Sequence, residues 1–395
     1  MILNIAGFLP CHVEAFNSVP LYSNKNKQSG LAIIMVLLIV ALMITLIGLL
    51  TEQQHLLIRR ISNQNISELG HQYATGVDAW ASRVLHDDQN TVVDYWGEDW
   101  ARFGDPPEIK SEDEYESFSL DPSSVKEKEP LPNIDFGVDG LAFKIEDLQG
   151  RFNLNNLANK DPNFIRGQKR VLINLFDVLE VGDLEERVYL YAALRDWLDS
   201  NKERTSPAQA ESSDYQIKKV PYYASDQKLT SIGELRFIDG FTNEVITTLE
   251  PYVVVLPIDN AKININTTAP EVLASLSNQT VIDMTQVDVF LQQRLDDAFI
   301  GFPTTTDAEN AIIGVSADGS LAVPNMLQTS SQYFQITSRV SLGESVYCTQ
   351  TTVVRNGFAA NTGTVNTPTS TIKASSGKIT ILNRQHSNYC DEIVR

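Results

Sequence analysis

The chain is mostly apolar from Leu31 to Leu50, and no charged residue falls inside this run of twenty. A helix rises about 1.5 Å per residue, so the run covers roughly 30 Å, the thickness of the hydrocarbon core of a bilayer. The pattern therefore predicts a transmembrane helix near the start of the chain.

Beyond this run, hydrophobic residues recur at spacings of three and four, with an interruption at Asn65. The periodicity predicts that the helix continues to about residue 86 and packs its apolar stripe against a sheet. The stripe comprises Ile58, Ile61, Leu69, Tyr73, Val77, Trp80 and Val84.

The later part of the chain changes between strand-like and helical patterns. Residues 105–133 are rich in Glu, Ser and Pro, which predicts a surface loop. Leu141–Asn155 alternates apolar and polar residues on either side of Gln149-Gly150, which predicts a β-hairpin. Helical patterns follow at Arg166–Leu179, Leu184–Leu198, Ser231–Ile238 and Pro270–Leu276, with Asn266, Thr267 and Thr268 as capping groups before Pro270. Strand-like patterns return at Tyr333–Ser341, Ser345–Val354 and Lys378–Leu382. Helices enclosed by strands indicate an α+β fold with an inserted helical block.

The chain carries 31 basic and 50 acidic residues, a formal net charge of −19. This balance argues against nucleic acid as a partner, because phosphates require Lys and Arg. The carboxylates fit either a solvated acidic surface or cation binding. Cys348 and Cys390 are the two cysteines that follow the apolar run; they either form a disulfide outside the cytoplasm or remain unpaired.

Small polar residues, Ser29-Gly30, precede the apolar run, whereas a cleaved secretory signal places them after it. This junction resembles a type IV prepilin leader, in which prepilin peptidase cuts after the glycine and the apolar helix stays attached. The resemblance implies cleavage between Gly30 and Leu31 and N-methylation of Leu31. An uncut membrane anchor remains the alternative.

Six short motifs follow one another along the chain: Glu98–Ala101, Asp147–Leu157, Asp196–Asp199, Glu234–Arg236, Ile263–Thr267 and Ala269–Leu273. Their order and spacing resemble the K-type minor pseudopilins of bacterial type II secretion. The resemblance implies an α+β, pilin-like fold with a long N-terminal transmembrane helix, an antiparallel sheet and a large all-α (SAM-like) insertion.

The same resemblance implies a division into domains. We expect a prepilin leader at 1–30, and a long helix at 31–86 whose transmembrane part is 31–50. A pilin-like α+β domain would combine 87–155 with 326–395, and 156–325 would form the inserted helical domain.

For function, the resemblance implies a non-enzymatic subunit at the tip of the pseudopilus. With the minor pseudopilins I and J it would start pseudopilus assembly, for export of folded proteins across the outer membrane. Further partners implied are other pseudopilins, prepilin peptidase and the inner-membrane assembly platform. The chain would cross the bacterial inner membrane once and place its globular domain in the periplasm.

The fifth residue after the predicted cleavage site is Met35, where fibre-forming pilins and pseudopilins usually carry glutamate. That carboxylate pairs with the N-terminal amine of the subunit above, and without such a partner it costs about 3 kcal/mol in the bilayer. A subunit at the tip has nothing above it. Met35 therefore fits a tip subunit, although it also fits an ordinary apolar anchor.

Oxygen-bearing side chains gather at Asp196, Asp199, Asn201, Glu211 and Asp214. Calcium takes six to eight oxygen ligands from flexible loops. The spacing does not match an EF-hand, so the residues alone favour a solvated acidic loop. The resemblance implies instead that calcium binds here, less tightly than in relatives with more acids.

The sequence offers little for catalysis. The histidines His12, His55, His71, His86 and His386 are scattered, and no nucleophile motif or phosphate-binding glycine loop occurs. Asn153, Asn155 and Asn156 are expected to serve turns and caps. Two other functions stay open: a minor pilin of a type IV pilus, and a membrane-anchored periplasmic calcium-binding protein without a fibre role.

Overall fold

The computed structural model describes residues 29–88, 92–102, 140–200, 215–218, 220–292, 294, 299–315, 326–342, 345–356 and 378–387. The chain forms two compact units, Met1–Asn65 and Ile66–Arg395. One helix, α1 (Ser29–Asp87), begins in the first unit and ends in the second. It continues through Asn65 without a break, although the boundary between the units falls there.

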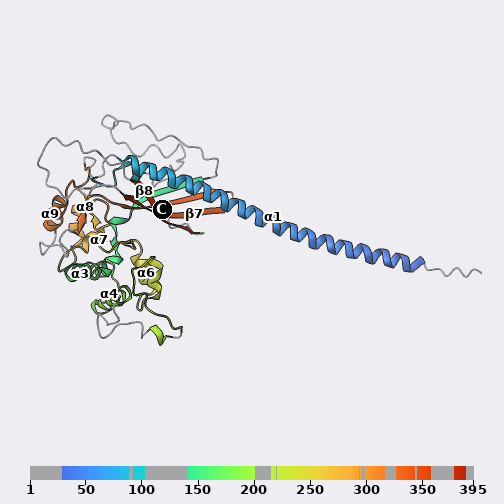
Figure 1. The fold of residues 1–395 in the computed structure, drawn as a ribbon, viewed down its shortest axis with the longest axis horizontal. Coiled ribbons are helices and arrows are strands. Elements are labelled where there is room, and N and C mark those ends of the chain that lie inside the picture. The colour runs from blue at the N-terminus through green and yellow to red at the C-terminus, as the bar shows by residue number, and fades with distance from the viewer. Residues whose placement is uncertain are drawn as a thin grey trace, which may run out of the picture. The chain divides into compact units, whose positions relative to one another are not determined.

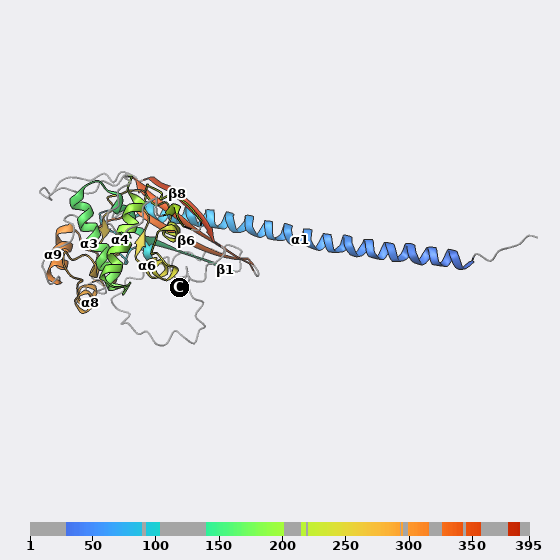
Figure 2. The ribbon, with the colours of Figure 1, turned by 90° about the horizontal axis from the view of Figure 1, so that it is seen from below.

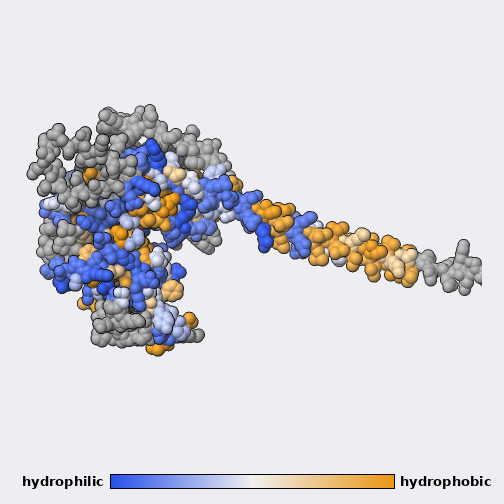
Figure 3. All heavy atoms as spheres, viewed as in Figure 1, coloured by the Kyte–Doolittle hydropathy of each residue, from blue (hydrophilic) through white to orange (hydrophobic). Residues whose placement is uncertain are grey.

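The described part of the first unit is the apolar half of α1. Every side chain from Leu31 to Leu50 is exposed, and the face of this stretch that Figure 3 shows is mostly hydrophobic. Within the described ranges, α1 is the one helix long and apolar enough to cross a membrane. The predicted transmembrane segment is therefore helical and buries none of its apolar surface in the protein.

The second unit contains a four-stranded antiparallel sheet in the order β1-β6-β7-β8 (Figure 1). The strands are β1 (Gly140–Asp147), β6 (Tyr333–Leu342), β7 (Ser345–Asn356) and β8 (Lys378–Ser387). The last residue of β1, Asp147, lies opposite Phe334 near the start of β6. The chain between these strands therefore leaves and re-enters the sheet at the same end.

The regular elements described in that intervening chain are mainly helices (Figure 2). Its α-helices are α3 (Pro162–Val178), α4 (Leu184–Leu198), α6 (Asn243–Leu249), α7 (Pro270–Ala274), α8 (Met284–Gln292) and α9 (Thr305–Val315). Its 3-10 helices are η2 (Leu148–Gly150), η3 (Leu154–Ala158) and η4 (Ile232–Phe237). Two short parallel pairs join β2 (Phe152–Asn153) to β3 (Val253–Val254) and β4 (Ile263–Asn264) to β5 (Leu327–Gln328). The short helix α2 (Asp99–Arg102) precedes β1.

Separate hydrophobic cores fill the two parts of this unit. The helical core is centred on α3 and α4 and includes Phe152, Phe176 and Trp197. The other core lies between α1 and the sheet and comprises Val77, Ala81, Leu85, Trp100, Ile145, Phe334, Ile336 and Val353. Residues 66–395 form one compact unit, with no division at 156 or 325. The boundaries of an inserted domain at these positions therefore stay a prediction.

The predicted hairpin around Gln149-Gly150 is wrong. β1 pairs with β6, whereas β2 pairs in parallel with β3. Between β1 and β2 the chain turns through η2, where the side chain of Asp147 accepts a 2.7 Å hydrogen bond from the Gln149 amide. This cap turns the chain out of the four-stranded sheet. The alternating residues that follow form β2, which pairs with β3.

The predicted capping of the helix at Pro270 is also wrong. Its N-cap is Ala269, which provides no side-chain bond. Thr267 and Thr268 donate instead to Asp147 and to the Gly150 carbonyl, at 2.6 and 2.8 Å. The two threonine hydroxyls therefore bond to groups distant in sequence and do not cap the helix.

The apolar stripe of α1 agrees with the predicted one only in its C-terminal part. Val77 is buried and Val84 packs against the same core, as expected, but Leu69 remains 44% exposed and Ile61 46% exposed. Three of the buried residues on the sheet side of α1 are glycine or alanine. The buried residues are Gly70, Ala74, Val77, Asp78, Ala81 and Leu85. Small side chains let the helix axis approach the sheet closely, whereas Trp80 and Val84 pack at the edge of this contact and are half-buried.

Candidate functional site

The residues of the predicted processing site lie on the first turns of α1. Gly30 and Leu31 directly follow Ser29, the first helical residue, whereas residues 1–28 lie outside the described ranges. Met35 follows on the next turn with 60% of its surface exposed. Cleavage after Gly30 and methylation of Leu31 stay predictions.

Two of the five predicted calcium ligands fall within the described residues. Asp196 lies in the last turn of α4, and Asp199 is the C-cap of the same helix. Both side chains are buried, and Asp199 Oδ2 lies 3.8 Å from Arg195 Nε. Their negative charge reaches Tyr191, whose pKa is raised mainly by burial and further by both carboxylates.

The other three predicted ligands, Asn201, Glu211 and Asp214, lie outside the described residues. The aromatic rings that flank the acidic segment meet, because Trp197 contacts Tyr215 edge to face at 5.5 Å between ring centroids. Trp197 follows Asp196 in sequence and Tyr215 follows Asp214, so this contact brings the two ends of the acidic segment together.

The donor chemistry at this segment fits calcium. Asp196 and Asp199 present carboxylate oxygens at a helix C-terminus, where the last carbonyls carry partial negative charge. Calcium takes such carboxylates and carbonyls as ligands. Calcium binding itself stays a prediction.

The asparagines after β2 bind main chain about a hundred residues away. Asn155 donates to the Leu256 and Leu229 carbonyls, at 2.7 and 3.0 Å, and accepts from the Leu229 amide at 2.8 Å. Asn156 pairs with both main-chain groups of Ala261 at 2.9 Å. A side-chain amide carries the same donor and acceptor as a peptide group. These side chains therefore satisfy main-chain groups inside the helical core that would otherwise need a backbone partner.

Asn153 combines a local and a distant role. Its Oδ1 accepts from the Asn155 amide at 3.4 Å, as the cap of η3, and from the Leu256 amide at 2.9 Å. The expected capping role is confirmed for this residue. Its long-range bond was not predictable from local sequence.

A second buried network is centred on Asp147. One carboxylate oxygen, Oδ2, accepts from Asn264 Nδ2 at 2.9 Å and from the hydroxyls of Thr267 and Ser331 at 2.6 Å each. Burial raises the pKa of Asp147, and these hydrogen bonds oppose the rise. The network joins the ends of β1 and β4 to the segment that leads into β6.

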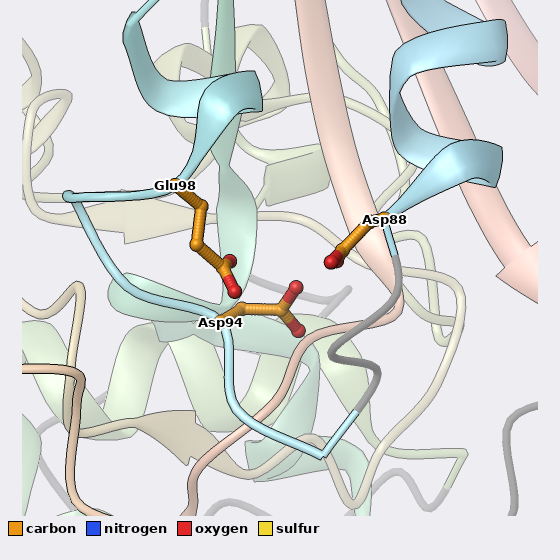
Figure 4. Close-up of side chains that lie close together, drawn as sticks. All are labelled: Asp88, Asp94 and Glu98. Atoms are coloured by element: carbon orange, nitrogen blue, oxygen red, sulfur yellow. The ribbon is translucent and has the colours of Figure 1, made fainter. Parts of the chain in front are cut away.

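Arg355 on β7 organises a third network, which contains the carboxylates shown in Figure 4. Its side chain is fully buried; Nη1 donates to Asp88 at 2.8 Å, and Nη2 donates to both oxygens of Asp94 at 2.6 and 2.5 Å. Glu98 completes the group, because one oxygen from each of the three carboxylates lies within 4.8 Å of the others.

The acid groups of this network have displaced pKa values. Burial raises the pKa of Asp94 to about 7, against the opposing charge of Arg355. Burial raises the pKa of Glu98 to about 8, and the negative charges of Asp88 and Asp94 add to the rise. Sequence reasoning placed Glu98 in a motif but missed this network, because its cation comes from a distant strand.

Cys348 on β7 is disulfide-bonded. Cys390 lies outside the described residues, so the predicted pairing of these two cysteines stays a prediction. His386 lies beside this site, with Nδ1 3.0 Å from the Cys348 carbonyl and its ring stacked on Tyr347 at 4.2 Å.

Comparisons with known proteins agree with this architecture. Residues 150–258 match the family model described as "Type II secretion system (T2SS), protein K". The type II secretion system protein K of Pseudomonas aeruginosa is 30% identical over 331 residues, which cover 81% of this chain and 86% of the relative. The protein K of Aeromonas hydrophila is 30% identical over 262 residues, 63% of this chain and 70% of the relative.

A solved structure has the same fold. It is a chain in "The Crystal Structure of the GspK-GspI-GspJ complex from enterotoxigenic Escherichia coli Type 2 Secretion System". The TM-score is 0.58 at 20% sequence identity, and the match covers 83% of this chain and 99% of that chain.

Proposed function

The chain belongs to the type II secretion system protein K family and is a minor subunit of a pseudopilus, and we propose that it occupies the pseudopilus tip. There it starts assembly together with the minor pseudopilins I and J, so that folded proteins are exported across the outer membrane. The related chain of known structure comes from a complex with GspI and GspJ, which supports this choice of partners.

Met35 is the observation that carries the tip position. A glutamate at this place would need an amine from a subunit above, since a lone carboxylate is costly in the bilayer. The methionine removes that requirement, while the amine of Leu31 remains able to pair with a subunit below. The helical block between β1 and β6 adds bulk at one end of the sheet, which suits a terminal subunit better than a repeating one.

The exposed apolar residues of α1 supply a surface for the partners. Leu56, Leu57, Ile58, Ile61 and Leu69 are all between 44 and 63% exposed. Burying such side chains against neighbouring helices contributes about 25 cal/mol per Å². The surface suits association with other pseudopilins and with the inner-membrane assembly platform.

The remaining features of the proposal concern processing and location. Prepilin peptidase cuts after Gly30, the amine of Leu31 is methylated, and the apolar part of α1 crosses the inner membrane once with the globular unit in the periplasm. We assign no catalytic activity, because the buried asparagines and carboxylates described above hold the fold together. Mass spectrometry of the mature protein tests the processing: a first residue other than Leu31 contradicts it.

The tip position predicts assembly with partners and no self-assembly. Full-length protein should co-purify with the I and J subunits from detergent-solubilised membranes, and cells that lack these two subunits should form no fibres from this chain alone. Electron microscopy of such cells decides the matter, because homopolymers of this chain would contradict the tip position.

Two positions on α1 separate assembly from folding. Leu69→Glu places a charge on an exposed site and should weaken co-purification several-fold while leaving the unfolding transition unchanged. Val77→Glu buries a charge in the core under the sheet and should destabilise the chain by itself. If Leu69→Glu leaves the complex intact, the exposed residues of α1 are not the contact surface.

We further propose that Asp196, Asp199, Asn201, Glu211 and Asp214 bind calcium. A ligand that binds only the folded state stabilises it by about 2.7 kcal/mol at a concentration of 100 Kd. Calcium added after EDTA treatment should therefore raise the melting temperature of the full-length protein. Asp199→Ala combined with Asp214→Ala should abolish this rise, whereas Glu244→Ala, a change at an exposed acid on α6, should keep it. An undiminished rise in the double variant would place calcium elsewhere.

A further inference from the structure

The exposed face of α3 is basic, although the chain as a whole is acidic. Residues 160–170 contain four basic residues and one acid, in a chain with 31 basic and 50 acidic residues. The four are Lys160, Arg166, Lys169 and Arg170. Lys169 is half-buried and the other three are exposed. Figure 3 shows hydrophilic surface where Figure 1 places α3. A positive patch therefore covers the first half of this helix.

The helix geometry places Arg166, Lys169 and Arg170 on one face, because they are three and four positions apart. The opposite face, with Val171, Leu172 and Leu175, is buried in the helical core. This packing fixes the rotation of α3 and thereby the direction in which its basic face points. Arg166 and Arg170 lie next to each other on that face, one helical turn apart.

Acids at the borders of this face are engaged in other contacts. Asp161 is the N-cap of α3, and its carboxylate accepts a 2.9 Å hydrogen bond from an amide of the first turn. In the last turn, Asp177 binds Arg187. Asp259, close to the chain before α3, binds Lys228 at 3.2 Å. Like charges at i and i+4 destabilise a helix, so an acidic partner would stabilise this arrangement.

We propose that the basic face of α3, formed by Arg166, Lys169 and Arg170, binds a protein segment that carries two carboxylates one helical turn apart. A guanidinium group donates two parallel hydrogen bonds to a carboxylate. Residues four apart on a helix have Cβ atoms about 5–6 Å apart, so glutamates at i and i+4 of a partner helix match the two arginines. Lys169 Nζ lies 4.9 Å from the centre of the Tyr191 ring, which limits the movement of its charge. This inference does not depend on the proposed role in secretion.

Extended anionic partners fit the face less well. Helices that bind a membrane surface insert large apolar side chains, and no large hydrophobic residue of α3 is exposed. Nucleic acids and anionic bilayers would also approach the remaining surface of a chain whose net charge is −19. A short acidic segment contacts the basic face alone. Physiological salt, with a Debye length of about 8 Å, screens it from the more distant acids.

Fluorescence anisotropy with two labelled helical peptides tests the proposal. Both peptides are based on alanine; one carries glutamates at i and i+4, and the other carries glutamines at the same places. Each is titrated with full-length protein in neutral detergent and EDTA, in salt of about 0.15 M. The glutamate peptide should bind in a saturable way, and several-fold more weakly at twice the salt concentration. Equal binding of the two peptides, or binding of neither, overturns the proposal.

Variants assign the binding to α3. Arg166→Gln combined with Arg170→Gln should weaken the affinity for the glutamate peptide several-fold. Arg236→Gln combined with Lys262→Gln removes the same charge from exposed residues outside α3 and should keep the affinity. Equal losses in the two double variants would mean that net charge alone controls binding, which contradicts the proposal.

Stability measurements identify two other occupants. Arg170→Gln removes a like-charge pair from α3 and should leave the melting temperature unchanged or raise it, because glutamine and arginine have similar helix propensities. A lower melting temperature without peptide binding would show that acids of this chain cover the face. A lipid surface would be indicated if phosphatidylglycerol added to the micelles, and not the glutamate peptide, stabilised wild type more than the variant with both arginines replaced. Either result overturns the proposal.

Discussion

At the scale of single residues, Glu98 couples the stability of the globular unit to pH. Its Oε2 accepts from Trp100 Nε1 at 2.6 Å and from the Tyr95 amide at 3.3 Å. Asp88 and Asp94 lie beside it, and the single guanidinium of Arg355 serves both of them. Ionisation of Glu98 therefore adds a third negative charge to a group that has one cation.

The sign of the effect follows from the direction of the pKa change. The pKa of Glu98 is raised from 4.5 to about 8 in the folded protein. A group with a raised folded pKa contributes stability that is fully present below its unfolded value and is lost as pH rises through the folded value. Acidification from pH 8 to pH 6 should therefore lower the unfolding equilibrium constant, by at most about fiftyfold for one proton.

Glu98→Gln imitates the protonated group and should remove this part of the pH dependence. Denaturant unfolding of the full-length protein in detergent and EDTA, at pH 6 and pH 8, provides the measurement. Relative to wild type, the variant should be more stable at both pH values, by more at pH 8 than at pH 6, with a residual pH response from Asp94. Glu244→Gln, at an exposed acid, serves as the control. If Glu98→Gln and wild type show the same pH profile, Glu98 is not the titrating group.

At the scale of elements, α1 meets the sheet through its smallest residues. A Cβ added at Gly70 would lie 2.4 Å from Cγ of Tyr347, whereas a Cβ at Gly76 would have nothing within 4 Å. Both glycines lie inside the same helix. They therefore form a matched pair for measuring how closely the helix and the sheet approach.

Alanine at these two positions should have opposite effects. Gly70→Ala should destabilise the unit by about 1–3 kcal/mol, because the helix must move away from β7. Gly76→Ala should stabilise it by roughly 0.5–1 kcal/mol, because alanine is the better helix former. Denaturant unfolding of the full-length chain measures both. Stabilisation by Gly70→Ala would mean that α1 does not rest on Tyr347.

At the scale of the whole molecule, the globular unit is held together where its two hydrophobic cores meet. A small third cluster lies there, with Leu148, Tyr333 and Val354 from the sheet side and Val254, Leu256 and Ala261 from the helical side. The networks around Asp147 and Arg355 surround the same junction, since Ser331 binds both Asp147 and Asp94. Of these polar groups, Asp147 lies in a family motif, whereas Ser331, Asp94 and Arg355 lie outside the motifs.

The sequence by itself determined those elements whose pattern repeats over many residues. The uncharged run of twenty residues in α1, the helices α3 and α4 and the strands β6 and β7 follow from local patterns of apolar and polar residues, because each element buries one face or none. The six short motifs also indicated the protein family. These features depend on neighbours in the chain, which a sequence displays directly.

Only the tertiary structure decided which polar atoms meet and which face of a helix is covered. Asn155 binds Leu229 and Leu256, and Arg355 binds Asp94, across 74, 101 and 261 positions of the chain. The hairpin at Gln149-Gly150 failed for the same reason, since β1 found its partner in β6. A buried polar group must be satisfied by whichever group the fold brings near it. Its partner therefore depends on where distant segments return, which local patterns do not record.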